Sequence, residues 1–493
     1  MTGQGAVKLD VDLSATAEPF RHCQEACVGS GHAALALRAD WQAQMRKCHG
    51  ELGFQCVHFH GLLDDDMSVC VGEPDYPAHH FHNVDLIFDF LLEIGMRPFV
   101  ELTFMPTVLA SGDRTVFHYR GNVTPPRDFG QWEDLVRDLA RHLAGRYGRQ
   151  EVARWHFGVW HEPNAERFWT GTQEDYFELY RRAAMAIKFV DGNFRVGGPG
   201  TEEGRWVAEM VEFCRKSGTP LDFVSTPCYP ERAAAGADCG PEEQVAASHR
   251  GRMADRTAEV RAQAGELPLF YTPWNSSTSC RDPFHDDPCA AAFCLKTIAD
   301  HDGLVDACSY WTFSDVCEEM PLSSWPFHGG LGMLTIHGVE KPSYHAFRFL
   351  HELGTERLPV DGGGRTVDGM AVSRGPTTHV LVWNYDVPGA ETQAEEVRLV
   401  LRGFDGSLTA GIERVDAENA NAKTAWEAMG RPHYPTGRQL AELRQASHVR
   451  REGLELAFRD DRAEAHFTLP ACGVARVTLA QSQRAVRRAS RRG

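Results

Sequence analysis

The segment VWHEPN, residues 159–164, places a single acid, Glu162, between a histidine and a proline at the end of an apolar run. Proline has no backbone N–H and therefore interrupts a sheet ladder, so Glu162 is expected at the mouth of a strand. A carboxyl group held there can point into a cavity and act as a general acid. The sequence therefore predicts a proton donor at Glu162, and such a donor requires a partner carboxylate elsewhere.

Short apolar runs alternate with amphipathic stretches over residues 21–357, a pattern typical of parallel strands connected by helices. Helices are predicted over 132–148 and 174–190, where apolar residues recur at helical spacing. Eight such repeats favour an α/β fold of the (β/α)8 TIM barrel type, whose chemistry lies at the C-terminal strand ends. The expected strands are residues 26–31, 57–61, 98–104, 157–163, 195–199, 222–227, 269–275 and 307–315.

Aromatic, amide and acidic side chains gather at the predicted strand ends, which read HFHG, ELTF, WHEPN, TPCY, TPWNSS and YWTFSD. Aromatic faces and hydrogen-bonding groups together suit a sugar, because a sugar ring has apolar faces and hydroxylated edges. An aromatic side chain at a strand end can equally serve only to plug the barrel. We take the pattern to predict a carbohydrate ligand, with Phe104 and Tyr229 among the candidate contacts.

Beyond residue 358 the helical periodicity gives way to strand-like segments such as HVLVWNYD and VRLVLRGF, with one predicted helix at 438–447. This pattern indicates an accessory antiparallel β-sandwich domain. We therefore expect an N-terminal segment at 1–20 that can join the β-domain, the barrel at 21–357, and the β-sandwich at 358–482. The arginine-rich residues 483–493 are expected to form a disordered basic tail.

A formal charge of −17 argues against nucleic acid as a partner, because phosphate binding requires concentrated lysine and arginine. The sequence shows neither the pattern of a signal peptide nor an apolar stretch long enough to span a bilayer, so we expect a cytoplasmic protein without membrane contact. The fourteen cysteines include no C-x-x-C pair, which predicts reduced core thiols and no zinc site. The histidine-rich segment at 79–82 has the i, i+3 spacing that can hold a metal, but it is interpreted as part of a partly exposed loop.

The strand ends resemble those of glycoside hydrolase family 39, in particular its bacterial β-xylosidases. Nine segments carry the resemblance in order along nearly the whole chain: HGLLDDD (60–66), RPFVELTFMP (97–106), GNVTPP (121–126), WHEPN (160–164), VGGP (196–199), LDFVS (221–225), SYWTFSD (309–315), FHGGLG (327–332) and MGRPHYP (429–435). The resemblance implies a barrel with a β-sandwich and hydrolysis of terminal β-linked xylose or a similar sugar with retention at the anomeric carbon. It also implies the absence of a metal or other cofactor and the possibility of a homo-oligomer.

The resemblance assigns roles to individual residues. Glu162 falls on the family's acid/base glutamate, in agreement with its expected place at a strand end. His60 matches a histidine that holds sugar hydroxyls, and Trp311 matches a tryptophan that forms a wall of the pocket. Glu318 and Glu319 match an acidic pair, of which at least one is expected to accept hydrogen bonds from the sugar.

The chain departs from the family pattern at the expected nucleophile. The family reads T-E followed by an aromatic residue and N-[ST]-S in the seventh strand, whereas this chain has Pro273 in place of the glutamate. A retaining mechanism requires a carboxylate about 5 to 5.5 Å from the acid/base, and proline cannot supply one. Two further departures belong to the same pocket: His161 replaces an asparagine, and Thr226 with Pro227 replaces a basic pair.

These departures leave three hypotheses. In the first, the protein is a glycosidase in which Asp315, Glu318 or Glu319 positions a water about 6.5 to 9.5 Å from Glu162 and inverts the anomeric centre. In the second, it is a catalytically inactive sugar-binding pseudoenzyme on the same barrel. In the third, Glu162 and His161 act as acid and base in a non-hydrolytic reaction. Neighbouring strand residues face opposite ways, which disfavours the third unless the strand end bends. Glycoside hydrolase remains the best description of the class.

Overall fold

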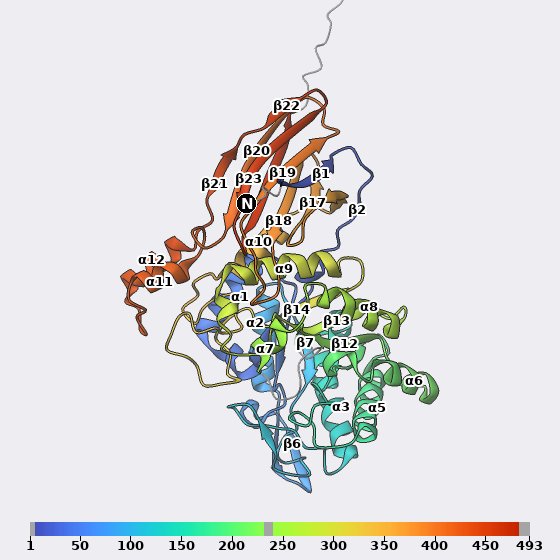
Figure 1. The fold of residues 1–493 in the computed structure, drawn as a ribbon. Helices are drawn as coiled ribbons and strands as arrows, with labels where there is room; N and C mark the ends of the chain where they lie inside the picture. Colours follow the sequence, from blue (N-terminus) through green and yellow to red (C-terminus); the bar gives the residue numbers. More distant parts are fainter. Residues whose placement is uncertain (1–4, 231–239, 483–493) are drawn as a thin grey trace, which may run out of the picture. The chain divides into compact units, whose positions relative to one another are not determined.

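Eight parallel strands close into a barrel in the computed structural model, which describes residues 5–230 and 240–482 (Figure 1). The strands follow one another around the barrel in chain order, and the last pairs with the first. They are β3 (Val28–His32), β4 (Cys56–His60), β7 (Arg97–Leu102), β10 (His156–Val159), β11 (Arg195–Pro199), β12 (Phe223–Cys228), β13 (Leu269–Trp274) and β14 (Ala307–Tyr310). Each overlaps one predicted strand, so the TIM-barrel prediction is confirmed.

Amphipathic helices follow the barrel strands in sequence. The predicted helices correspond to α3 (Phe129–Tyr147) and α5 (Gln173–Val190), which pack against each other, and α5 begins with a capping box at Thr172. The other helices of this unit are α1 (Ala39–Leu52), α2 (His82–Glu93), α4 (Arg149–Val152), α6 (Val207–Ser217), α7 (Pro241–Ala246) and α8 (Arg252–Ala264). Among the helices of the described chain, none combines the length and apolar character needed to cross a bilayer.

Two short hairpins interrupt the barrel repeats, and the sequence did not predict them. The first pairs β5 (Cys70–Glu73) with β6 (Tyr76–His79), and the second pairs β8 (Thr115–Val116) with β9 (Gly121–Asn122). The histidine-rich segment spans the end of β6 and the start of α2 rather than lying in one loop. His79 there contacts Asp138, with Nδ1 2.9 Å from Oδ2.

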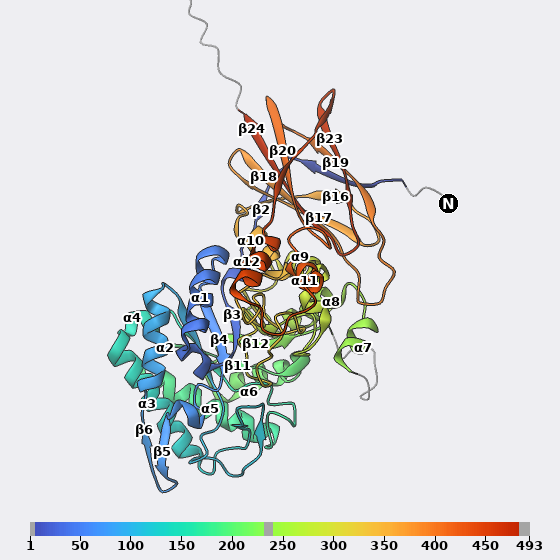
Figure 2. The ribbon, with the colours of Figure 1, turned by 90° about the vertical axis from the view of Figure 1, so that its left-hand side faces the viewer.

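Two sheets, antiparallel except for one parallel pair among the described strands, form a second compact unit, as predicted for a β-sandwich. The five-stranded sheet has the order β16-β1-β19-β23-β22 and the seven-stranded sheet the order β2-β15-β17-β18-β24-β20-β21. One apolar core takes residues from both sheets, among them Val11, Leu399 and Phe467 from the first and Val380 and Val477 from the second. Figure 2 shows β18, β20 and β24 in one layer and β16, β19 and β23 in the other.

The strands of this unit come from both ends of the chain. They are β1 (Val7–Asp12), β2 (Glu18–Pro19), β15 (Glu356–Leu358), β16 (Val360–Gly362), β17 (Val367–Arg374), β18 (Thr377–Asn384), β19 (Glu395–Arg402), β20 (Ser407–Val415), β21 (Arg451–Leu454), β22 (Ala457–Arg459), β23 (Arg462–Leu469) and β24 (Val474–Ser482). The N-terminal β1 runs parallel to β19. The predicted helix near 438–447 is α12 (Gly437–Ala446), and it is preceded by α11 (Ala422–Ala428), which the sequence did not indicate.

The division of the chain differs from the expected boundaries. The sandwich unit comprises the residues up to 22, residues 286–299 and those from 340 onward, and the barrel unit comprises residues 23–285 and 300–339. Most of α9 (Pro288–His301) and all of α10 (Pro342–His351) therefore group with the sheets. The predicted basic tail at 483–493 lies outside the described residues.

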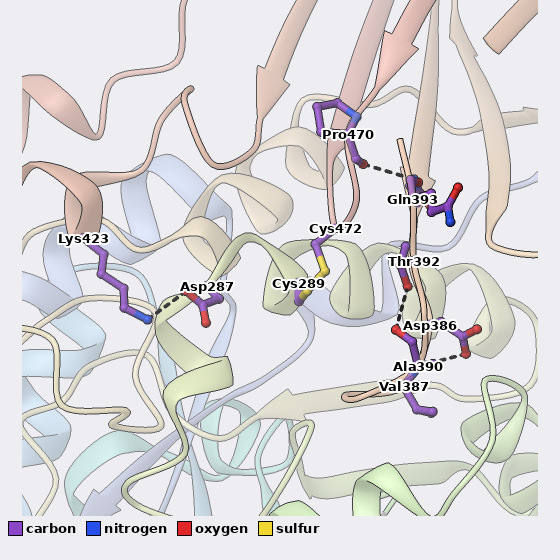
Figure 3. Close-up of a disulfide and its surroundings, with 11 residues drawn as sticks. Asp287, Cys289, Asp386, Val387, Ala390, Thr392, Gln393, Lys423, Pro470 and Cys472 are labelled. Carbon is purple, nitrogen blue, oxygen red and sulfur yellow. Dashed lines mark hydrogen bonds and ion pairs between the residues drawn. A yellow bond between two sulfur atoms is a disulfide. The ribbon is translucent and has the colours of Figure 1, made fainter. Parts of the chain in front are cut away.

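The prediction that all cysteines are reduced is wrong for one pair. Cys289 near the start of α9 forms a disulfide with Cys472, which lies in the turn before β24 (Figure 3). The two Cα atoms are 4.4 Å apart although 183 positions separate the residues in sequence. Nothing in the local sequence marks such a distant pair, because only the folded sheet brings the turn against the helix.

Candidate active site

A cavity of about 120 Å³ opens at the C-terminal ends of the barrel strands. Its lining combines aromatic rings, histidines, an arginine and carboxylates. The lining residues are His60, Val116, Phe117, His161, Glu162, Arg167, Phe168, Tyr229, Pro273, Thr278, Trp311 and Glu319. The structure thus brings most of the predicted site residues into one cavity, and Phe104 and Glu318 lie outside its lining.

The chain turns sharply just before Glu162. Strand β10 ends at Val159, and both Trp160 and Glu162 adopt left-handed backbone conformations, with φ of 69° and 43°. The turn is held by the backbone, because the N–H of Glu162 donates to the carbonyl of Gly200 over 2.8 Å. As a result, His161 and Glu162 both face the cavity, and His161 Nε2 lies 3.9 Å from Glu162 Oε1. The strand end does bend, which removes the objection to their acting on one ligand.

Arg167 is the main polar partner of Glu162, and sequence reasoning missed it. Its Nη2 lies 3.0 Å from Glu162 Oε2 and 2.9 Å from Glu202 Oε1. The guanidinium also sits 4.7 Å from the centre of the Phe168 ring. The Glu162 side chain is 4 % exposed, so this bridge fixes a nearly buried carboxylate at the cavity wall.

A histidine and glutamate network supports the floor of the cavity. Glu101, on β7, accepts hydrogen bonds from His58 Nε2 at 2.5 Å and from His60 Nδ1 at 3.0 Å. Burial alone would raise the pKa of Glu101, but the charge and hydrogen bonds of the two histidines hold it well below its usual range. Burial, together with the nearby His60, holds the pKa of His161 well below its ordinary value, so His161 is a neutral imidazole.

The acidic pair after β14 is divided between two places. Glu319 lines the cavity and accepts hydrogen bonds from Trp311 Nε1 at 2.7 Å and from the Cys280 thiol at 3.3 Å. Glu318 instead faces His32, with Oε2 3.6 Å from Nδ1. Asp315 accepts from the Gly332 N–H at 2.8 Å and does not line the cavity. Of Asp315, Glu318 and Glu319, the three candidate replacement bases, Glu319 lines the cavity.

Aromatic side chains complete the walls. The Trp311 and His60 ring centroids are 4.5 Å apart, and His60 lies 4.1 Å from His161. Phe104 is fully buried behind this layer, with its ring 6.1 Å from His60. Pro273 contributes to the wall from β13, where the chain provides no carboxylate. Among the described lining residues, the acids are Glu162 and Glu319.

Comparison with known proteins places these features in context. The model of the family "Glycosyl hydrolases family 39" matches residues 7–460. The chain is 48% identical over 431 residues to a β-xylosidase from Caldicellulosiruptor saccharolyticus, covering 86% of this chain and 88% of the relative. It is 35% identical over 460 residues to a β-xylosidase from Geobacillus stearothermophilus, covering 88% of each. The structure of a monomeric β-xylosidase from Caulobacter crescentus superposes with a TM-score of 0.85 at 29% identity, covering 97% of this chain and 100% of that one.

Proposed function

Because the chain belongs to glycosyl hydrolase family 39 and is β-xylosidase-like over nearly its whole length, we propose that its cavity binds the terminal sugar of a β-xyloside or similar glycoside. Glu162 then donates a proton to the leaving oxygen, and the attacking nucleophile comes from outside the chain. The observation that carries this proposal is that Glu162 and Pro273 line the same cavity.

The lining suits such a ligand. Trp311, Phe117 and Phe168 offer apolar surfaces for a sugar ring, while His60, His161 and Glu319 offer donors and acceptors for its hydroxyl groups. The neutral His161 can donate one hydrogen bond and accept another, which matches a sugar hydroxyl.

Double displacement with a covalent intermediate is incompatible with Pro273, since this mechanism needs a carboxylate at the anomeric carbon opposite the proton donor. A water or a small anion can take that role. Glu319 supports the water route, because it is the other carboxylate of the described lining, and its oxygens are oriented by Trp311 and Cys280.

Turnover of an aryl β-xyloside with and without azide tests this proposal. Azide displaces the aryl alcohol, which takes its proton from Glu162, and the product is an α-xylosyl azide detectable by NMR. We expect slow turnover that azide accelerates, and Glu162→Gln should remove the azide-dependent rate with an unactivated leaving group.

Pro273→Glu tests the missing nucleophile directly, with Pro273→Gln as a control of equal size but without the charge. We expect retaining xylosidase activity in the first variant and none in the second. Sugar binding without turnover in wild type with azide and in Pro273→Glu would contradict the proposed chemistry and favour a sugar-binding pseudoenzyme.

A non-hydrolytic reaction has one observation in its favour, the 3.9 Å approach of His161 Nε2 to Glu162 Oε1 within the cavity. An acid and a neutral imidazole at this distance can move a proton at one carbon of a bound sugar. Solvent deuterium appearing in a recovered sugar, lost in His161→Asn, would support this reaction in place of hydrolysis.

A further inference from the structure

A second cluster of chemically reactive side chains lies outside the cavity lined by Glu162, called the sugar cavity below. It joins His32, the last residue of β3, to Asp64 and Asp66, which follow β4. His32 Nε2 lies 3.6 Å from Asp64 Oδ2 and 3.3 Å from Asp66 Oδ2, and the three atoms lie within 4.8 Å of one another. None of these residues lines the sugar cavity.

The polar atoms at the centre of this cluster have no hydrogen-bond partner in the described structure. His32 is 1% exposed, and neither of its ring nitrogens makes a hydrogen bond. Asp64 uses Oδ1 to accept from the Phe104 N–H at 2.9 Å, whereas its buried Oδ2 makes no hydrogen bond and faces His32. Buried polar atoms of this kind are normally satisfied, so their convergence points to a missing ligand.

The other group of histidines and an acid in this unit differs from this cluster in its hydrogen bonding. His58, His60 and Glu101 also lie close enough to hold an ion, but hydrogen bonds of 2.5 and 3.0 Å already join them. In the cluster around His32 the corresponding distances are 3.3 and 3.6 Å, too long for charge-assisted hydrogen bonds.

The 3.3 Å separation between His32 and Asp66 matches the coordination sphere of a small cation, and the 3.6 Å separation between His32 and Asp64 matches it after a small inward shift of Asp64. With metal–ligand distances of about 2.1 Å, neighbouring ligand atoms lie about 3.0 to 3.4 Å apart in octahedral or tetrahedral geometry. The imidazole is fixed for this role, because its ring stacks on Tyr119 with centroids 3.9 Å apart and planes at 6°. On its other side, Nδ1 faces Glu318, the position at which metal-binding histidines commonly meet a carboxylate.

The surrounding chain leaves room and access for the ion. Gly61 lies against the cluster with φ of 70°, and a Cβ there would come within 2.5 Å of Asp64 Oδ2 and 2.9 Å of the His32 ring. A separate cavity of about 320 Å³ is lined by Asp64, Asp66 and Tyr119. Asp66 is 48% exposed, so a hydrated ion can reach the site from solvent.

We propose that His32 Nε2, Asp64 Oδ2 and Asp66 Oδ2 form a binding site for a divalent transition metal ion, with Glu318 orienting the imidazole. One nitrogen and two carboxylate oxygens suit Zn²⁺ or Mn²⁺ better than Ca²⁺ or Mg²⁺, which prefer oxygen ligands alone. Water from the adjoining cavity, which Asp64 and Asp66 line, would fill the remaining coordination positions.

The site has a structural consequence for the sugar cavity. His60 lies four positions before Asp64, and Glu318 directly precedes Glu319, and both His60 and Glu319 line the sugar cavity. A bound ion connects β3, the segment after β4 and, through His32, the segment after β14. It therefore orders two walls of the sugar cavity without touching the ligand.

Calorimetric titration of chelator-treated, untagged protein with Mn²⁺ and, separately, Zn²⁺ tests the proposal. We expect one equivalent of at least one of these ions to bind wild type. Asp66→Asn should weaken that binding about tenfold or more, and because Asp66 is half exposed this variant should fold normally. Pulsed electron paramagnetic resonance of bound Mn²⁺ should show nitrogen coupling from one imidazole, which His32→Gln should remove.

Asp65→Asn is the matched control. Asp65 lies between the two proposed ligands, but its Oδ1 accepts from the Thr107 N–H at 2.9 Å, a bond that asparagine can retain. Binding that depends on Asp66 and not on Asp65 supports the site. Wild type that binds neither ion, or equal affinities in wild type and Asp66→Asn, or equal weakening in Asp65→Asn, would overturn it and leave His32 as an imidazolium held by ion pairs.

Discussion

The disulfide between Cys289 and Cys472 allows a quantitative prediction about stability. Replacing either cysteine by alanine, or reducing the bond, should lower the free energy of unfolding of the sandwich unit. A crosslink over 183 positions restricts the unfolded chain by about 5 kcal/mol in the loop-entropy treatment, while measured effects are typically about 2 to 4 kcal/mol. We therefore expect a loss of about 2 to 4 kcal/mol.

The assay is urea denaturation of wild type with and without reductant, followed by the same measurement on Cys472→Ala. Reductant should lower the unfolding midpoint of wild type and leave that of Cys472→Ala unchanged. Cys294→Ala is the control, because Cys294 lies on the same helix α9, is buried and is outside the disulfide, so reductant should still destabilise this variant.

Thiol titration of the unfolded protein provides an independent check. Wild type should show two fewer reactive thiols before reduction than after it. Equal thiol counts before and after reduction, or identical midpoints with and without reductant, would refute the reasoning. The expected difference in thiols requires that the crosslink exists, and the expected shift of the midpoint requires that it restrains the unfolded chain.

Three further predictions concern His156, Arg167 and Lys341. Burial, with Arg195 nearby, lowers the pKa of His156 to about 4. The folded state therefore resists protonation, so the stability that His156 contributes is complete above its ordinary pKa of about 6.5 and is lost as pH falls toward 4. At pH 5 this loss is about 2 kcal/mol relative to pH 7, and it should be absent in His156→Phe when both proteins are unfolded in urea at each pH. Arg167→Ala should lower azide-dependent kcat about tenfold or more, because the carboxyl group of Glu162 loses the guanidinium that positions it at 3.0 Å; an unchanged kcat would contradict this positioning role. Lys341→Met should destabilise the protein by about 3 to 5 kcal/mol, because it removes the cation 2.7 Å from the buried Asp286, and the double variant with Asp286→Leu should recover much of the loss in thermal unfolding.

The barrel was predictable because its strands are mostly buried and read as short, largely apolar runs. FVELTF and LFYTPW, for example, are six residues long and rich in aromatic residues, which favours a buried strand over a helix. The placement of Glu162 at a strand end was predictable for a related reason, since Pro163 marks where the ladder stops.

Other features depend on contacts between distant parts of the chain. The shared cavity position of His161 and Glu162 requires left-handed backbone at Trp160, a residue type that gives no hint of it. Arg167 and Glu162 meet because the chain turns back after β10. Cys289 and Cys472 meet only after the strands β15 to β23, which lie between them in sequence, have folded into the two sheets. The separation of Glu318 from Glu319 depends on which way each side chain turns, which the dipeptide alone does not specify.

The position of β1 within its sheet constrains how the protein is made. This strand lies between β16 and β19, both of which leave the ribosome only after the whole barrel has been synthesised. During translation β1 therefore remains unpaired with β16 and β19 until the barrel residues have been synthesised. A nonsense mutation before residue 395 would deprive β1 of its parallel partner. A single cut in the chain cannot separate the barrel from the sandwich, because the sandwich contains residues that lie both before and after the barrel in sequence.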